Sequence, residues 1–159
     1  MVEYTLGLFY ALLGAAIAQG MGGISAGWGV AASGVPGAGV VTEDPRKFGP
    51  VMVLDAIPQT QGVYGFICAF MILLGTGILG TIQPISTELG LAALGAGIVV
   101  GLTSITAIPQ GIICGAGMVA IAKKPEVLGQ SIVLAVMAET FAIIGLLTAI
   151  LIFVGIGFI

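Results

Sequence analysis

The chain contains no histidine and very little charge. Of its 159 residues only 7% are charged, with four Lys and Arg against seven Asp and Glu. The absence of histidine excludes a histidine general base and histidine-based zinc chemistry. Four basic residues are too few for a nucleic-acid binding surface. The two cysteines, Cys68 and Cys114, both lie inside apolar runs. We therefore predict that they are small packed hydrophobic residues rather than a disulfide or a metal pair.

Apolar residues dominate what is present. Hydrophobic residues make up 58% of the chain, and a soluble domain of this size would need far more charge to cover its surface. The composition predicts an integral membrane protein. The first 20 residues have no positively charged start, and their apolar stretch continues too far for a cleaved signal peptide. We expect this segment to be the first spanning helix.

Four segments are long and apolar enough to cross a membrane. A hydrocarbon core of about 30 Å requires about 20 helical residues. Helices are the expected spanning element, because lipid cannot satisfy free backbone groups and no repeated strands of alternating polarity occur. The sequence therefore predicts an all-α membrane protein with four transmembrane helices, near residues 5–41, 48–76, 86–121 and 128–158.

The basic residues predict the orientation of these helices. All four lie in two short connections, "TEDPRKFG" with Arg46 and Lys47, and "AKKPEVLG" with Lys123 and Lys124. The remaining connection, "GTIQPISTELG", has no Lys or Arg. Because basic loops stay in the cytoplasm, we expect a multi-pass protein of the cell membrane with both termini on the extracytoplasmic side.

The two halves of the chain look like copies. "EDPRKFGPVMVLDAIPQTQGVYGF" and "KKPEVLGQSIVLAVMAETFAIIGL" align without gaps at an offset of 80 residues, so that Pro45 meets Pro125 and Gly49 meets Gly129. This predicts two duplicated helical hairpins, 1–80 and 81–159. At the same offset Gln59 stands where Glu139 stands, so that one half keeps a carboxylate and the other has an amide.

The first and third helices are rich in Gly, Ala and Ser, whereas the second and fourth are rich in larger apolar residues. Small residues let helix backbones approach closely, and in lipid van der Waals packing drives association. We predict an inner layer of the first and third helices and an outer layer of the second and fourth, with many copies closing into a ring. An ordinary four-helix bundle with one crowded interface is the alternative.

Polar residues from three helices share one depth. They lie 14 to 16 residues from the proline of the nearer basic loop, which places them about 21–24 Å from the loops at 1.5 Å per residue. Pro58 and Pro109 flank this layer, and each removes a helical hydrogen bond. The residues at this level are Glu139, Gln110, Thr60 and Gln61. Ile57, Thr60, Gln61 and Tyr64 also share one face of the second helix.

An ionised carboxylate at this depth costs several kcal/mol, so Glu139 must be protonated or paired. The compensating group is a proton, a metal ion or a residue of another chain. Several oxygen ligands suit a hard cation, and one carboxylate balances one positive charge, which favours Na⁺ over Ca²⁺. Tyr64 is placed to donate a hydrogen bond to Glu139. The alternative for each amide and hydroxyl is a structural bond between helices.

Asp55 is a second carboxylate within the predicted spans. It follows Pro45 by 10 residues, and helical geometry turns it away from the face of Ile57, Thr60 and Gln61. Three environments are open for it: hydration, a bond to a neighbouring subunit, or a place on an ion route.

With these residues identified, the chain resembles the membrane-ring subunit of V-type ATPases, the 16-kDa proteolipid or subunit K/c. The motifs are "LDAIPQTQGVYGF", "AIPQG", "AKKPE" and "MAETFAIIGL", and the resemblance is to the bacterial or archaeal Na⁺-translocating kind. It implies a ring turned by a central stalk that contacts the cytoplasmic loops. It implies Na⁺ bound by Glu139, Gln110, Thr60, Gln61 and the Ile57 carbonyl, with Tyr64 bonded to the glutamate. The chain departs from the family at Phe141, where a tyrosine often stands, and at Asp55, often an amide.

The sequence has no nucleotide motif or catalytic set, so we expect a non-catalytic subunit surrounded by lipid. An exposed, ion-free Glu139 needs a cation from elsewhere, and we expect an arginine of a membrane stator subunit. Li⁺ and H⁺ are alternative cargoes. A ring subunit that carries only H⁺, and a stand-alone small cation transporter or channel, remain open as other functions.

Overall fold

The computed structural model describes residues 5–82 and 84–158, and every regular element among them is a helix. The first membrane-crossing segment is α1 (Leu6–Glu43), and the second consists of α2 (Phe48–Ala56), the 3₁₀ turn η2 (Ile57–Gln59) and α3 (Thr60–Gly75). The third consists of α4 (Thr87–Thr103), the 3₁₀ turn η3 (Ser104–Thr106) and α5 (Ala107–Lys123), and the fourth is α6 (Leu128–Gly155). Single 3₁₀ turns, η1 (Pro45–Lys47) and η4 (Pro125–Val127), join these segments within each half.

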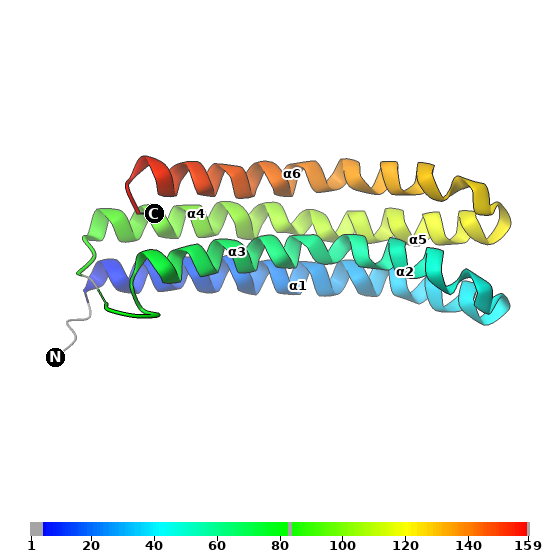
Figure 1. Ribbon diagram of the computed structural model, residues 1–159, viewed down its shortest axis with the longest axis horizontal. Coiled ribbons are helices and arrows are strands. Elements are labelled where there is room, and N and C mark those ends of the chain that lie inside the picture. Colours follow the sequence, from blue (N-terminus) through cyan, green and yellow to red (C-terminus); the bar gives the residue numbers. More distant parts are fainter. Residues whose placement is uncertain (1–4, 83, 159) are drawn as a thin grey trace.

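The four segments are long and apolar enough to span a membrane. This confirms the predicted multi-pass, all-helical fold, and the predicted helix ends agree with the observed ones within a few residues. All the segments run along the long axis of the molecule (Figure 1). The two turns that contain the basic residues lie at one end, and the connection from α3 to α4 lies at the other.

Polar side chains cap the first and third segments. The Thr5 hydroxyl accepts a hydrogen bond from the Leu8 amide at 3.2 Å, and the Ser86 hydroxyl accepts one from the Leu89 amide at 3.3 Å. Both caps satisfy amides that have no partner within the helix. Thr5 also donates to the Ile85 carbonyl at 2.9 Å, which joins the start of α1 to the residues just before α4.

Glycine brings α1 against α4 and α5 at close range. Gly7 opposes Gly90, Gly14 opposes Gly97, and Gly29 opposes Gly111, so that a Cβ added to Gly97 would lie only 2.7 Å from the Gly14 Cα. The first and third segments therefore form the closely packed pair predicted from their small residues. The second segment packs against α1, while α6 packs mainly against α4 and α5.

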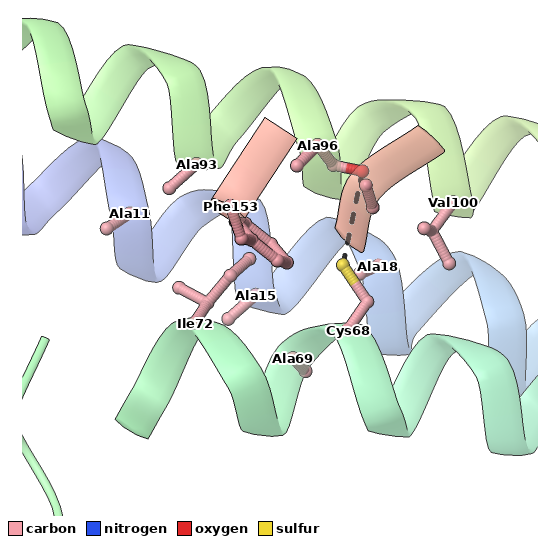
Figure 2. Packing of buried hydrophobic residues seen from close by; sticks show 11 residues of the cluster. Ala11, Ala15, Ala18, Cys68, Ala69, Ile72, Ala93, Ala96, Val100 and Phe153 are labelled. Atoms are coloured by element: carbon pink, nitrogen blue, oxygen red, sulfur yellow. Dashed lines mark hydrogen bonds between the residues drawn. The ribbon is translucent and has the colours of Figure 1, made fainter. Parts of the chain in front are cut away.

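Small side chains also fill the core at the end opposite the basic turns. Figure 2 shows Ala11, Ala15 and Ala18 of α1 in one cluster with Ala93 and Ala96 of α4, and Ala15 lies beside Ile72 of α3. Cys68 enters the same cluster from α3, with its sulfur 4.0 Å from the Ala96 carbonyl oxygen. Cys114 lies in a second apolar cluster. Both cysteines are buried, as predicted for packed hydrophobic residues.

Side chains of the first basic turn stabilise this end of the molecule. The Arg46 guanidinium donates to Asp44 at 2.9 Å, and this bond lowers the pKa of the Asp44 carboxyl from its ordinary value. The Lys47 ammonium donates to the carbonyl of Ala122 near the C-terminus of α5. A cation is favourable there because the helix dipole is negative at that end. The first turn is thereby joined to the second half of the chain.

The glycine contacts predict that alanine substitutions at two positions of α4 will differ strongly in their effect on stability. Gly97→Ala should lower the free energy of unfolding by about 1–3 kcal/mol, because the added methyl meets backbone that cannot move aside as a side chain would. Thermal or denaturant unfolding of the purified protein in detergent measures this loss. Gly95→Ala is the matched control, since a Cβ there meets nothing within 4 Å. Equal stability of the two variants would contradict the close-packing explanation.

Candidate functional site

Two breaks in α-helical geometry position the polar layer. In the second segment, η2 contains Pro58, which cannot donate the hydrogen bond that would continue the helix. In the third segment, η3 ends three residues before Pro109. The hydroxyls of Ser104 and Thr106 donate to the carbonyls of Val100 and Thr103, at 2.7 and 2.8 Å. Such bonds satisfy backbone acceptors where the regular ladder is interrupted.

A chain of hydrogen bonds joins three membrane-crossing segments at this level. Tyr64 of α3 donates its hydroxyl to Glu139 Oε1 of α6 at 2.5 Å. The Gln110 Nε2 of α5 lies 3.5 Å from Glu139 Oε2. The Gln110 Oε1 accepts from Gln61 Nε2 of α3 at 2.8 Å. The structure therefore brings together four of the six residues that the sequence singled out.

Gln110 is fixed by three contacts. Its Nε2 also donates to the Ala135 carbonyl of α6 at 3.1 Å, and its side chain is fully buried. The two hydrogens of this amide are thus directed at α6, and its oxygen is directed at α3. The Ala135 carbonyl is a site component that sequence reasoning missed. No residue type could have indicated it, because every residue carries a backbone carbonyl.

Gln61 supplies an acceptor with no protein partner. Its side chain is fully buried, and its Oε1 is the one buried side-chain oxygen or nitrogen among the described residues that makes no hydrogen bond. A buried polar atom left in this way costs about 1–3 kcal/mol, and such atoms in folded proteins call for a partner such as water or an ion. This oxygen belongs to the same side-chain amide that donates a hydrogen bond to Gln110. Gln110 in turn lies beside Glu139, so that Gln61 is linked to the carboxylate through one residue.

Thr60 and Ile57 lie on the same turn but bond to each other. The Thr60 hydroxyl donates to the Ile57 carbonyl at 2.9 Å, and no hydrogen bond among the described residues joins this pair to Glu139. Both oxygens keep free lone pairs. The pair is therefore placed beside Gln61 as an acceptor-rich turn, and its direct contact with the carboxylate stays a prediction.

Glu139 is buried without a basic partner. Its side chain is 8% exposed, and the ion pair of Arg46 with Asp44 is the only one within residues 5–82 and 84–158. The carboxylate is bonded by neutral donors, which stabilise a negative charge without neutralising it. The site can therefore accept one positive charge among oxygen atoms.

Asp55 has its partner within the same chain. Its Oδ1 accepts a 2.6 Å hydrogen bond from the hydroxyl of Ser33 on α1. As helical geometry predicted, it is not bonded to the group around Glu139. None of the environments proposed from the sequence anticipated this contact, because the rotation of α1 against α2 is not encoded in the spacing of either segment alone.

Comparison with known proteins identifies the family. The family model for the ATP synthase C subunit matches the chain twice, over residues 13–72 and 90–152. The A-type ATP synthase subunit K of Methanocaldococcus jannaschii is 43% identical over 94% of this chain, which spans 64% of that relative's length.

Two further relatives are matched over most of their length. The V-type sodium ATPase subunit K of Enterococcus hirae is 37% identical, over 91% of this chain and 93% of the relative. The 16 kDa proteolipid of the V-type proton ATPase of Nephrops norvegicus is 27% identical, over 91% of this chain and 90% of the relative. The members of the ATP synthase C-subunit family are non-catalytic ring subunits of rotary ATPases. Because the family model matches both halves of the chain and the relatives have these identities, the chain belongs to this family.

Proposed function

We propose that this chain is a rotor-ring subunit that carries Na⁺ across the membrane, one ion per chain, at Glu139. The observation that carries the proposal is a buried carboxylate linked through Gln110 to Gln61, whose Oε1 is buried without a hydrogen-bond partner. A cation there would offset the charge of Glu139 and satisfy Gln61 together. The Enterococcus relative is named as a subunit of a sodium ATPase, which supports the choice of Na⁺.

In this proposal the ion is held by oxygen atoms alone. The ligands are the side chains of Glu139, Gln110, Thr60 and Gln61 with the backbone carbonyl of Ile57. Tyr64 is not a ligand, and its 2.5 Å bond to Glu139 orients the carboxylate. Hard oxygen donors with a single carboxylate suit a monovalent cation. Li⁺ has the same charge and chemistry, and it is the alternative metal cargo.

In this proposal the net charge of the site decides whether it can pass through lipid as the ring turns. With Na⁺ bound, Glu139 and the ion form a neutral group that tolerates the hydrocarbon while the ring turns. Once the ion leaves, the bare carboxylate needs another cation, and all four Lys and Arg of this chain lie in the two basic connections. We propose that an arginine of a membrane stator subunit meets Glu139 at that point and blocks backward rotation past an empty site.

The proposed ring follows the packing of the single chain. The small-residue segments, α1 and α4–α5, would line the inside of a ring of identical subunits, and α2–α3 and α6 would form its outer surface. Large apolar side chains such as Met137 and Phe141 of α6 are exposed in the single chain, as expected for surfaces covered by lipid or by neighbouring copies. We further propose two hairpins, 1–80 and 81–159, of which only the second carries the ion-binding carboxylate.

The proposed orientation places both basic turns in the cytoplasm, where a central stalk would contact them. The bond from Lys47 to Ala122 ties the first basic turn to the end of α5, just before the second, and this supports one continuous docking end. Both termini would then lie outside the cytoplasm.

Sodium binding by purified rings tests the ligand set. We expect Glu139→Gln to abolish ²²Na⁺ binding, because an amide cannot balance the charge of the ion. Gln61→Ala should weaken binding by about tenfold or more, the effect expected for loss of an ion-bonded oxygen. Gln59→Ala, two residues away on the same segment and exposed, is the control and should leave binding unchanged. Wild-type binding retained in Glu139→Gln would refute the site.

Carbodiimide labelling separates Na⁺ from H⁺ as the cargo. We expect Na⁺ to slow the labelling of Glu139 in wild-type rings, since a bound ion blocks the protonated carboxyl with which the reagent reacts. Gln110→Ala should require a higher Na⁺ concentration for the same protection. Mass spectrometry of the labelled peptide gives the rate. Labelling that Na⁺ leaves unchanged would favour a proton-carrying ring, as in the Nephrops relative named as part of a proton ATPase.

The orientation is tested with single introduced cysteines. A thiol at Glu126→Cys in the second basic turn should react with a membrane-impermeant reagent only from the cytoplasmic side. A thiol at Gly80→Cys, in the connection from α3 to α4, should react only from the other side. Both positions are exposed, whereas the native Cys68 and Cys114 are buried. Right-side-out and inverted vesicles give the comparison, and reversed accessibility would overturn the topology.

A further inference from the structure

The hydrogen bond between Ser33 and Asp55 lies just before a 3₁₀ turn, and three of the five proposed ion ligands lie in this turn or directly after it. Asp55 stands two residues before η2, which runs from Ile57 to Gln59. The turn is followed at once by Thr60 and Gln61. Any change in the direction of α2 at Asp55 is therefore passed to the Ile57 carbonyl and to both side chains.

The backbone at this turn lacks one helical hydrogen bond. Pro58 lacks an amide hydrogen, so the Leu54 carbonyl loses its usual helical donor. Contacts from neighbouring helices must then fix the turn. On one side the buried Pro58 ring lies against α1, where a Cβ on Gly29 would come within 2.8 Å of the Pro58 Cβ. On the other side Gln61 bonds Gln110.

The Ser33 hydroxyl is directed at Asp55. Its oxygen lies 2.6 Å from Asp55 Oδ1, 3.1 Å from the Val30 carbonyl and 3.2 Å from the Gly29 carbonyl. A hydroxyl has one hydrogen to donate, and the carboxylate is the nearest of these acceptors. Ser33 is fully buried, and the loss of a buried hydrogen bond leaves its partner without a replacement from water. Within the part of the chain that the structure describes, this is the side-chain hydrogen bond that joins α1 to α2.

We propose that Ser33 and Asp55 are positioning residues for the ion-binding layer. Their hydrogen bond fixes the end of α2 against α1, and so sets where η2 places the Ile57 carbonyl, Thr60 and Gln61. The inference rests on the proposed function, because it assigns the turn a role in ion binding. It gives Asp55 a task that needs its hydrogen bond to Ser33 and not the passage of an ion.

Sodium affinity of variant rings tests the positioning role. We expect Ser33→Ala and Asp55→Leu each to weaken ²²Na⁺ binding about three- to tenfold and to change the ratio of Na⁺ to Li⁺ affinity, because the ligands shift. Asp55→Asn keeps an acceptor for the Ser33 hydroxyl and should bind as wild type does. The double variant Ser33→Ala with Asp55→Leu should be no weaker than the weaker single variant, since both remove the same bond.

Ser131→Ala is the matched control. Ser131 is a buried serine whose hydroxyl bonds the Val127 carbonyl at 3.0 Å at the start of α6, so its loss leaves η2 untouched. Unchanged affinity and selectivity in both Ser33→Ala and Asp55→Leu, even with a lower melting temperature, would overturn the proposal. A loss in Asp55→Asn equal to that in Asp55→Leu would also overturn it, because the charge would then be what matters. If Asp55→Leu rings do not assemble, Ser33→Cys, with its weak thiol donor, takes that variant's place.

A second measurement keeps this inference separate from the choice of ion. In sodium-free buffer, the carbodiimide labelling rate of Glu139 reports how well the polar layer covers the carboxylate. We expect faster labelling in Ser33→Ala and unchanged labelling in Ser131→Ala. If wild-type rings bind no Na⁺, the proposed cargo fails while this rate still decides the positioning role. An unchanged rate in Ser33→Ala would refute it.

Discussion

A single carboxylate held deep within an apolar helical bundle constrains most of what surrounds it. Glu139 has neutral donors as its protein partners, with the Tyr64 hydroxyl on one oxygen and the Gln110 amide near the other. Neutral donors orient such a group without removing its charge. In the function proposed above, the layer presents oxygen atoms to an external cation, and the Gln61 Oε1, which has no hydrogen-bond partner, supports that proposal.

Close packing of small residues sets the frame in which this carboxylate sits. The glycine contacts of α1 with α4 and α5 bring backbones together where any side chain would intrude. This contact fixes the level of Gln110 relative to α1, and α1 in turn contacts the second segment through Gly22 and Gly65. Polar geometry at the centre thus depends on apolar packing along the whole length of the helices, because no loop contributes a residue to the site.

Much of this arrangement could be predicted because segment length, hydropathy and residue spacing can be read directly from the sequence. Segment length and hydropathy indicated the four spanning helices, and counting residues from Pro45 and Pro125 placed Gln61, Gln110 and Glu139 at one level. The partner of Asp55 could not be predicted, since it depends on how α1 is rotated. The hydrogen bond from Gln110 to the Ala135 carbonyl could not be predicted for a different reason. Every residue has a backbone carbonyl, so the residue type does not indicate which one is used.

The first and third membrane-crossing segments differ in length by one residue, and their geometry compensates for the difference. The first spans 38 residues of continuous α-helix, despite Pro36, while α4, η3 and α5 together hold 37. A 3₁₀ residue rises about 2.0 Å and an α-helical residue about 1.5 Å, so both paths come to about 57 Å. A segment with one residue fewer can thus span the same distance when one of its turns is a 3₁₀ turn. Both segments can then begin and end at the same levels of the molecule, although the third has one residue fewer.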